Sequence, residues 1–264
     1  MNARTSNIIT IARALAHYPR VIPFLLRGRE AANMKLAEEQ IRRLRRRHLI
    51  SGSVDDPLEI FRLSATLTSA DTAMLNDNAF LLPLVERIKP AKVVETGVSK
   101  GVSSAFILAA LGAKDDLYSI DLPNKNYVLD SGAEWSDALP SNMRIGSVVP
   151  HTLRNRWHLL LGDSRRVLSP LLDALGEIDF FFHDSEHTLD CMLFEYREAW
   201  KHLRPGGLII SDDIDWSPAF DQFIRETGAP HARVKCRNSE KGAVLKPPLP
   251  AASKLRKSCL AERT

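Results

Sequence analysis

Acidic side chains follow two short apolar runs of the chain, and residues of this type could do chemistry. Asp184 comes after Phe180 to His183, and Asp212 and Asp213 come after Leu208 to Ser211. Carboxylates held at neighbouring strand ends repel one another strongly unless a cation or protons intervene. An all-oxygen set suits a hard divalent ion, with Mg²⁺ as the default, so these three acids are predicted metal ligands. In the alternative interpretation, Asp212 caps a turn and Asp213 faces solvent.

A glycine-containing turn follows another apolar run and could bind a ligand. It has the form Glu95-x-Gly97-x-x-x-Gly101 and leads into a helical segment with Ser103 in its first turn. Glycines let the backbone turn sharply and approach a ligand, and a helix start offers free amide donors. The spacing is not GxGxxG, and an acid at this place repels phosphate. Glu95 instead suits a cationic ligand such as an amino acid with a free ammonium group, although a glycine turn can also serve packing alone.

Two further strand ends carry acids. Asp121 lies some 20 residues beyond Gly101, roughly the distance at which a carboxylate in such folds holds ribose hydroxyls. Gly162-Asp163-Ser164 ends the next run and could bracket an adenine, with Asp163 accepting a hydrogen bond from the exocyclic amine. Asp163 could equally cap the following helix, or do both. Acids at three successive strand ends fit a positively charged nucleoside better than a nucleotide.

The elements that must position these residues alternate between short strands and helices from Ala91 onward, which predicts a parallel sheet of the α/β class. Strands are expected at Lys92 to Glu95, Leu117 to Asp121, Trp157 to Leu161, Ile178 to His183 and Leu208 to Ser211. Helices are expected at Val102 to Leu111, Arg165 to Leu175, Leu189 to Leu203 and Pro218 to Thr227. Ala232 to Asn238 and Gly242 to Lys246 read as a closing hairpin. The segment Asn124 to Arg154 is too long for an ordinary loop, which predicts a lid or binding element.

The first ninety residues are predicted to be helical, with a boundary near Asp55. Helices are expected near Ser6 to Leu15, Glu30 to His48, Leu58 to Leu67 and Asp71 to Ile88. The chain then divides into a helical extension (1–55), a helical cap (56–90), the α/β domain (91–246) and a basic, poorly ordered tail (247–264). The apolar stripe of the helix Glu30 to His48 is narrow, so it packs on the main domain or on a partner subunit, which allows a homo-oligomer.

Composition and charge narrow the class of protein. The net charge of +4 is uneven, with five arginines between Arg42 and Arg47. Such a run could dock nucleic acid or anionic lipid, but a solvated helix face is the commoner explanation, and no aromatic residues are interleaved. The longest apolar runs fall far short of the roughly 20 residues that cross a bilayer, and no secretory signal is recognised, so a cytoplasmic protein is expected. Three widely spaced cysteines argue against a disulfide framework or a zinc site.

The quoted motifs together resemble a class I S-adenosylmethionine-dependent methyltransferase. The residues that carry the resemblance are Val93 to Leu108, Ile120-Asp121, Gly162-Asp163-Ser164 and Ile178 to Phe220. More narrowly, the chain is similar to the metal-dependent O-methyltransferases of sugars and natural products, over roughly Asp71 to Lys246. The resemblance implies a Rossmann-like seven-stranded fold, mostly parallel with a final antiparallel strand, and S-adenosylmethionine as cofactor.

The resemblance also implies roles for single residues. In similar enzymes the matching acids bind a metal that holds two substrate oxygens and lowers the pKa of the one to be methylated. The base that removes the proton is expected to be His187, which has a suitable ordinary pKa, or Glu186, which matches an acid proposed as base. The residues predicted to bind the cofactor are Glu95, Gly97, Gly101, Ser103, Asp121, Gly162, Asp163, Ser164 and His183.

The predicted function is methyl transfer from S-adenosylmethionine to a hydroxyl of a small-molecule acceptor, a sugar or natural product, with magnesium assistance. Two alternatives stay open: an RNA or lipid-head-group methyltransferase that uses the arginine run, and a non-catalytic module that binds the cofactor. Trp216 and Phe220, just after the acidic pair, could line the acceptor site, though aromatics at a helix start are as often core.

Overall fold

The computed structural model describes residues 22–47, 54–70, 77–123, 127–128, 134–135, 139, 143–237 and 239–248. The helix expected near Ser6 to Leu15 and most of the tail lie outside these residues. No described helix is both long and apolar enough to cross a membrane.

Seven strands form one sheet in the order β5-β2-β1-β6-β7-β9-β8. They are β1 (Lys92–Thr96), β2 (Asp116–Asp121), β5 (Trp157–Leu161), β6 (Ile178–His183), β7 (Leu203–Ser211), β8 (His231–Lys235) and β9 (Glu240–Leu245). The first five of these run parallel, whereas β9 is antiparallel to both of its neighbours. This arrangement confirms the predicted Rossmann-like fold with a closing antiparallel strand.

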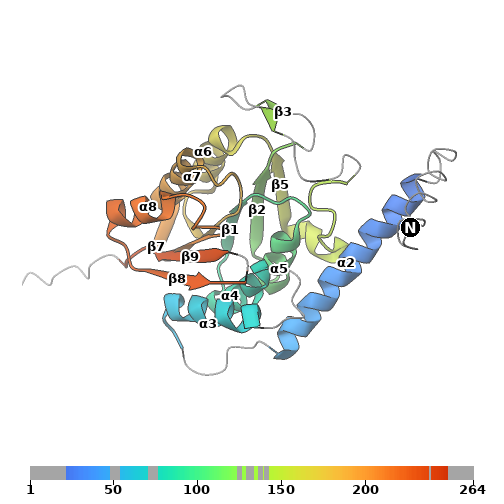
Figure 1. Ribbon diagram of the computed structural model, residues 1–264, viewed down its shortest axis with the longest axis horizontal. Coiled ribbons are helices and arrows are strands. Elements are labelled where there is room, and N and C mark those ends of the chain that lie inside the picture. Colours follow the sequence, from blue (N-terminus) through green and yellow to red (C-terminus); the bar gives the residue numbers. More distant parts are fainter. Residues whose placement is uncertain are drawn as a thin grey trace, which may run out of the picture.

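Helices cover both faces of the sheet (Figure 1). One face carries α3 (Pro57–Ala70), η1 (Asp77–Phe80), α4 (Leu81–Ile88) and α5 (Val102–Ala110), and the other carries α6 (Ser164–Leu175), α7 (Leu189–His202) and α8 (Ala219–Thr227). Successive residues of a strand point to opposite faces. Phe180 and Phe182 therefore pack against the first group, while Phe181 packs against the second. Because both faces are buried, the central strands read as unbroken apolar runs.

The N-terminal helix α2 (Ile22–Arg47) lies diagonally across α4 and α5 (Figure 1). Its residues Ile41 and Leu44 are buried in the same core as the sheet. Arg45 Nε donates to Glu86 Oε1 at 3.0 Å, and its Nη2 donates to the Ala109 carbonyl at 2.5 Å. The sequence left open whether this helix packs on its own domain or on a partner, and it packs on its own domain.

The continuous helix expected from Asp71 to Ile88 is wrong over its described part. A 3₁₀ turn, η1, precedes α4, and Pro83 lies in the first turn of α4, where its missing N–H costs no hydrogen bond. Between 124 and 154 the structure describes a two-stranded hairpin of β3 (Tyr127–Val128) and β4 (Glu134–Trp135) and the start of η2 (His151–Arg156). The lid or binding role of this segment stays a prediction.

Candidate active site

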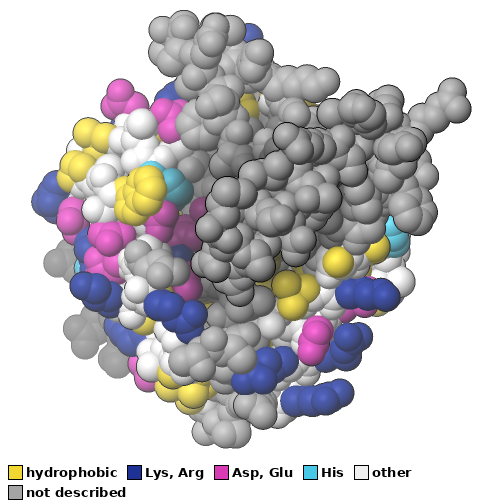
Figure 2. Space-filling view, turned by 45° about the vertical axis from the view of Figure 1, so that its right-hand side comes forward, with side chains coloured by type: hydrophobic (Ala, Val, Ile, Leu, Met, Phe, Trp, Pro, Cys, Tyr) yellow, Lys and Arg dark blue, Asp and Glu magenta, His cyan; other side chains and the backbone are white. Residues whose placement is uncertain are grey.

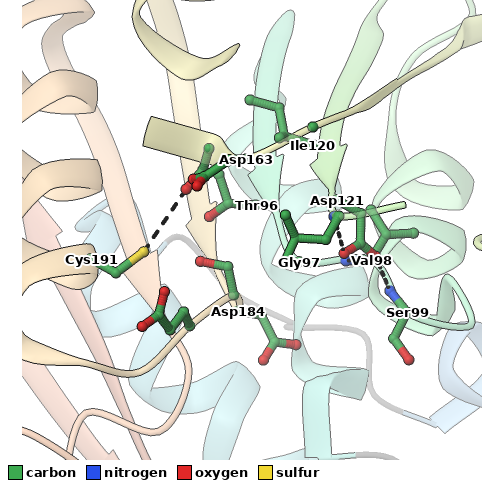
Figure 3. Close-up of a pocket in the computed structure, with 14 residues that line it drawn as sticks. Thr96, Gly97, Val98, Ser99, Ile120, Asp121, Asp163, Asp184 and Cys191 are labelled. Atoms are coloured by element: carbon green, nitrogen blue, oxygen red, sulfur yellow. Dashed lines mark hydrogen bonds between the residues drawn. The ribbon is translucent and has the colours of Figure 1, made fainter. Parts of the chain in front are cut away.

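A pocket opens at the carboxyl ends of β1, β2, β5 and β6, where parallel α/β sheets bind their ligands. It holds about 650 Å³ of empty space, open solvent included. Figure 3 shows Gly97, Val98 and Ser99 on one side and Cys191 on the other, with Asp184 between them. The lining residues are Thr96, Gly97, Val98, Ser99, Ile120, Asp121, Leu122, Gly162, Asp163, Ser164, Asp184, Ser185, Glu186 and Cys191.

At Gly97 the backbone of the glycine turn packs closely against the backbone just after β6. Its φ of +84° lies in the left-handed region, and a Cβ atom built on it would sit 1.8 Å from the Asp184 carbonyl oxygen. The Asp184 amide in turn donates to the Thr96 carbonyl at 2.8 Å. Only glycine allows the two backbones to approach this closely, so the glycine that the sequence predicted for ligand approach also fixes Asp184 in place.

Asp121 ends β2 and holds the glycine turn through its carboxylate. Its Oδ2 accepts hydrogen bonds from the amides of Val98 at 3.1 Å and Ser99 at 2.7 Å (Figure 3), and Oδ1 accepts from the Leu122 amide at 2.7 Å. Ser99 itself has a positive φ of 49°, a conformation that such bonds help to hold. Asp121 thus shapes the pocket wall.

Asp163 has one engaged and one unsatisfied oxygen. Its Oδ1 caps α6 by accepting from the Arg165 amide at 2.9 Å, as the sequence allowed. Its Oδ2 is buried and has no hydrogen-bond partner among the described residues, and the whole residue is only 3% exposed. Because an unsatisfied buried acceptor is costly, this oxygen marks a place where a ligand donor is expected.

Glu95 lies under the glycine turn and does not face the pocket, contrary to the prediction that it meets an ammonium group. Its carboxylate accepts from the hydroxyls of Ser103 and Ser104, both at 2.6 Å, and of Ser119 at 2.7 Å. Glu95 shares the strand face of Val93, which α5 covers, so the side chain points into the interior. Burial raises the pKa of Glu95 to about 7, against the effect of the three hydroxyls.

Three other residues predicted to contact the cofactor also lie outside the pocket lining. The Ser103 hydroxyl is engaged with Glu95, and a Cβ on Gly101 would meet the Gly146 Cα at 2.7 Å, so this second glycine serves a close packing contact. His183 is fully buried behind the strand end, where its Nδ1 lies 2.6 Å from Glu195 Oε2.

Glu195 of α7 anchors a buried polar network that the sequence interpretation missed. It also accepts from the hydroxyls of Thr96 at 2.5 Å and Ser185 at 2.8 Å. Burial alone would raise the pKa of Glu195, but His183 and these hydrogen bonds outweigh burial and lower it. The network fixes the strand ends on either side of Asp184. Glu195 could have been recognised in the sequence as an acid among the apolar residues that form the buried face of the helix.

The three predicted metal ligands do not form a metal site. Among the described residues, no group of three or more His, Cys, Asp or Glu side chains is placed to hold a metal ion. Lys241 of β9 donates from Nζ to Asp212 Oδ1 in a buried ion pair, and Asn78 of η1 donates to Asp184 Oδ2 at 2.9 Å. Burial alone would raise the pKa of Asp212, but the Lys241 ammonium outweighs burial and lowers it. Partners from distant elements thus engage Asp212 and Asp184, and the metal-ligand role of the three acids stays a prediction.

The other two acids keep raised pKa values. Burial and then the charge of Asp212 raise the pKa of Asp184 well above its ordinary value. The same two causes raise the pKa of Asp213 to about 6. The charge of Lys241 and the raised pKa values of Asp184 and Asp213 both reduce the repulsion among the three carboxylates. A cation or protons are what such a cluster of acids requires.

The two candidate bases lie in different surroundings. Glu186 lines the pocket and is engaged by Arg165 Nη2 at 3.1 Å and by the Thr188 hydroxyl at 3.0 Å. His187 instead lies between the rings of His183 and Trp216, with centroids 5.2 and 5.5 Å away. Its Nε2 is buried without a hydrogen-bond partner among the described residues. Burial and the neighbouring His183 lower the pKa of His187 to about 4, so the ring is neutral at physiological pH.

Aromatic residues after the acidic pair take different places. Trp216 is 69% exposed beside His187, whereas Phe220 is buried in the core against α7. Trp216 therefore lies where it can contact an acceptor, and Phe220 does not. Phe220 also closes over Gly242, where an added Cβ would lie 2.4 Å from its ring.

Comparison with known proteins finds a family model that matches part of the chain. Residues 94–214 match a family model described as a methyltransferase domain. The match begins in β1 and ends just beyond β7, so it spans the strands whose ends form the pocket. No curated protein matches the chain.

Solved structures resemble the chain at low identity. Cofactor-bound Rv0187 from MTB is 15% identical over 74% of this chain and 92% of its own, with a TM-score of 0.50. The O-methyltransferase from Bacillus cereus in complex with SAH is 19% identical over 75% and 94%, at 0.46. TomG from Streptomyces achromogenes, an O-methyltransferase of Tomaymycin synthesis in complex with SAM, is 15% identical over 75% and 92%, at 0.49. The family match over residues 94–214 and the fold shared with Rv0187 agree with the predicted methyltransferase fold.

Proposed function

We propose that this chain transfers a methyl group from S-adenosylmethionine to a hydroxyl oxygen of a small-molecule acceptor. The observation that carries the proposal is the unsatisfied Asp163 Oδ2, buried at the pocket end of β5 within the matched methyltransferase domain. An exocyclic adenine amine would supply the donor that this oxygen lacks.

The remaining pocket residues suit the other parts of the same cofactor. Asp121 stands ready for ribose hydroxyls, and the turn around Gly97 leaves room for the methionine portion close to the backbone. When bound, the cofactor supplies a methyl group already activated on a sulfonium. The protein's tasks are then to align the acceptor oxygen and to remove one proton.

His187 fits the acceptor side better than Glu186 does. Glu186 is held by Arg165, whose position at the start of α6 puts the pair beside Asp163 on the cofactor side. The unpartnered Nε2 of neutral His187 can accept the hydrogen of an acceptor hydroxyl. With a pKa near 4 it orients that hydroxyl and takes up its proton only as the O–CH₃ bond forms, so it is a weak base.

Magnesium has no step in this proposal, because Lys241 and Asn78 already engage the acids that would hold it. A sugar or polyketide-derived acceptor remains the proposed class, since exposed Trp216 offers a face on which a ring can stack. Figure 2 shows several Lys and Arg side chains near one another at the lower right of the view, with few acids among them. Within the arginine run, Arg45 pairs with Glu86 and holds α2 against α4, a structural role that needs no RNA.

Titration calorimetry with S-adenosylmethionine, before and after Asp163→Asn, tests the cofactor half. Asparagine keeps the helix cap but turns an amide donor toward the adenine amine, so affinity should fall about tenfold or more. Asp173→Asn, on the exposed side of α6, is the matched control and should leave affinity unchanged. Mass spectrometry of a panel of hydroxylated acceptors then tests methyl transfer. Absence of cofactor binding by the wild type would refute the proposal.

A further inference from the structure

Lys241 is the feature of the site that the proposed function does not use. It lies in β9 among buried residues and is only 1% exposed. Among the described residues, Asp212 is the hydrogen-bond partner of its ammonium. A buried ammonium is costly unless it is paired, so a lysine is not retained at such a place as a mere filler of space.

The topology explains how the lysine reaches the acids. Because β9 runs antiparallel to β7, the start of β9 lies beside the end of β7, with Ser211 paired to Gly242. Lys241 is thus delivered to the edge of the sheet at which the parallel strands deliver their acids.

One oxygen of Asp212 already has several donors. Its Oδ1 accepts from the Lys241 ammonium, from the Asp213 amide at 2.7 Å and from the Ser239 hydroxyl at 3.3 Å. Asn78 holds one oxygen of Asp184 at 2.9 Å. A divalent ion bound by these two acids would sit beside the fixed positive charge of Lys241, which Coulomb repulsion opposes at low dielectric.

We propose that Lys241 is the built-in cation of the acceptor site, taking the place of a divalent metal between Asp184 and Asp212. Naming this region the acceptor site rests on the proposed function, whereas the exclusion of metal does not. The ammonium has three donors, of which Asp212 takes one. It supplies a fixed positive charge that stabilises negative charge on an acceptor oxygen as the proton leaves.

Removing the ammonium should open the acids to metal. Thermal unfolding and equilibrium dialysis with Mg²⁺ and Mn²⁺ compare the wild type with Lys241→Gln, whose amide can still donate to Asp212. We expect no metal-dependent shift for the wild type. For Lys241→Gln we expect metal affinity at least about tenfold higher and a midpoint that rises by about 4 °C or more with saturating metal.

Two control variants test whether a metal response comes from loss of the Lys241 charge and not from any substitution in or near β9. Lys246→Gln removes a lysine just after β9, where it donates to the Trp200 carbonyl, and should gain no metal response. Lys241→Arg keeps the positive charge and should also stay indifferent to metal. If Lys241→Gln does not fold, the wild type decides: dialysis that finds no bound Mn²⁺ and cofactor affinity that survives EDTA support the proposal.

A wild type that binds one Mg²⁺ or Mn²⁺ per chain with a rise in midpoint would overturn the proposal. So would a folded Lys241→Gln, shown by unchanged circular dichroism, that ignores metal. Cofactor calorimetry on the same samples keeps the two ideas apart. Loss of S-adenosylmethionine binding in the wild type refutes the proposed function, while the metal titration still tests Lys241.

Discussion

The pocket and the neighbouring cluster of Asp184, Asp212 and Lys241, the proposed cofactor and acceptor sides of the site, stand at one edge of one sheet but are built differently. On the cofactor side, Asp121 and Asp163 each follow their own strand and bond to backbone amides next along the chain or on the adjoining turn. On the acceptor side, Asp184 and Asp212 bond to side chains that arrive from η1 and from β9. The backbone partners of Asp121 and Asp163 are compatible with their proposed cofactor roles. The side-chain partners of Asp184 and Asp212 instead compete with a metal for the same carboxylates.

The largest expected effect comes from a substitution at Gly97, where the backbone of the glycine turn packs against the backbone at the end of β6. In Gly97→Ala the new methyl group meets the Asp184 carbonyl, and the positive φ strains the residue besides. We expect a loss of about 4 kcal/mol or more in the free energy of unfolding, measured by denaturant titration, together with loss of cofactor binding. Gly228→Ala is the control. Its φ of +61° is also positive, but nothing lies within 4 Å of the added Cβ, so only about 1 kcal/mol should be lost. Equal losses in the two variants would show that the close approach at Gly97 is not what matters.

The same contrast between neighbouring and distant partners explains which features could be predicted from the sequence. The strands β5 and β6 have the predicted bounds because each is a short, mainly apolar run; β6 is buried in the centre of the sheet, whereas β5 is a partly exposed edge strand. β7 begins at Leu203 and not at Leu208, because Arg204-Pro205-Gly206-Gly207 resembles a turn although it continues the strand past a register shift against β6. The pocket acids could be found because each ends a strand. Lys241 and Asn78 could not be assigned, since nothing local in the sequence indicates which strand ends they meet.

Asp121→Ala should have the next largest effect, and only on the cofactor half. The change removes the acceptor that holds the Val98 and Ser99 amides and that suits ribose hydroxyls. We expect the dissociation constant for S-adenosylmethionine, measured by calorimetry, to rise about 100-fold. Asp116→Ala, at the other end of β2, removes an exposed carboxylate beside His158 and should change nothing. An unchanged affinity in Asp121→Ala would refute its role in the pocket.

A smaller effect is expected from Glu95 and appears only as a dependence on pH. Burial favours the protonated form, and the pKa is raised from 4.5 to about 7. The stabilisation is therefore complete below the unfolded pKa, near 4.5, and is lost as pH rises through about 7. Relative to Glu95→Gln, the wild type should lose about 2 kcal/mol in the free energy of unfolding between about pH 5 and pH 8.

Denaturant titrations at several pH values across that range check the expectation for Glu95. Glu177→Gln, an exposed acid between α6 and β6, should keep a constant difference from the wild type. A constant difference for Glu95→Gln as well would mean that the carboxylate is ionised throughout. The original assignment of Glu95 to a cationic ligand would then regain support, because an ionised Glu95 needs a nearby positive charge.

The smallest expected effect comes from Trp216→Ala, which should change only the proposed acceptor side of the site. Trp216 is 69% exposed and touches His187, so Trp216→Ala removes little buried area and should change the free energy of unfolding by less than about 0.5 kcal/mol. Loss of a stacking face should raise KM for a methylated acceptor about fivefold, with the cofactor dissociation constant unchanged. Leu67→Ala, another exposed apolar side chain, in α3, should alter neither quantity. A change in cofactor affinity without one in acceptor KM would place Trp216 on the cofactor side and remove the boundary drawn between the two halves.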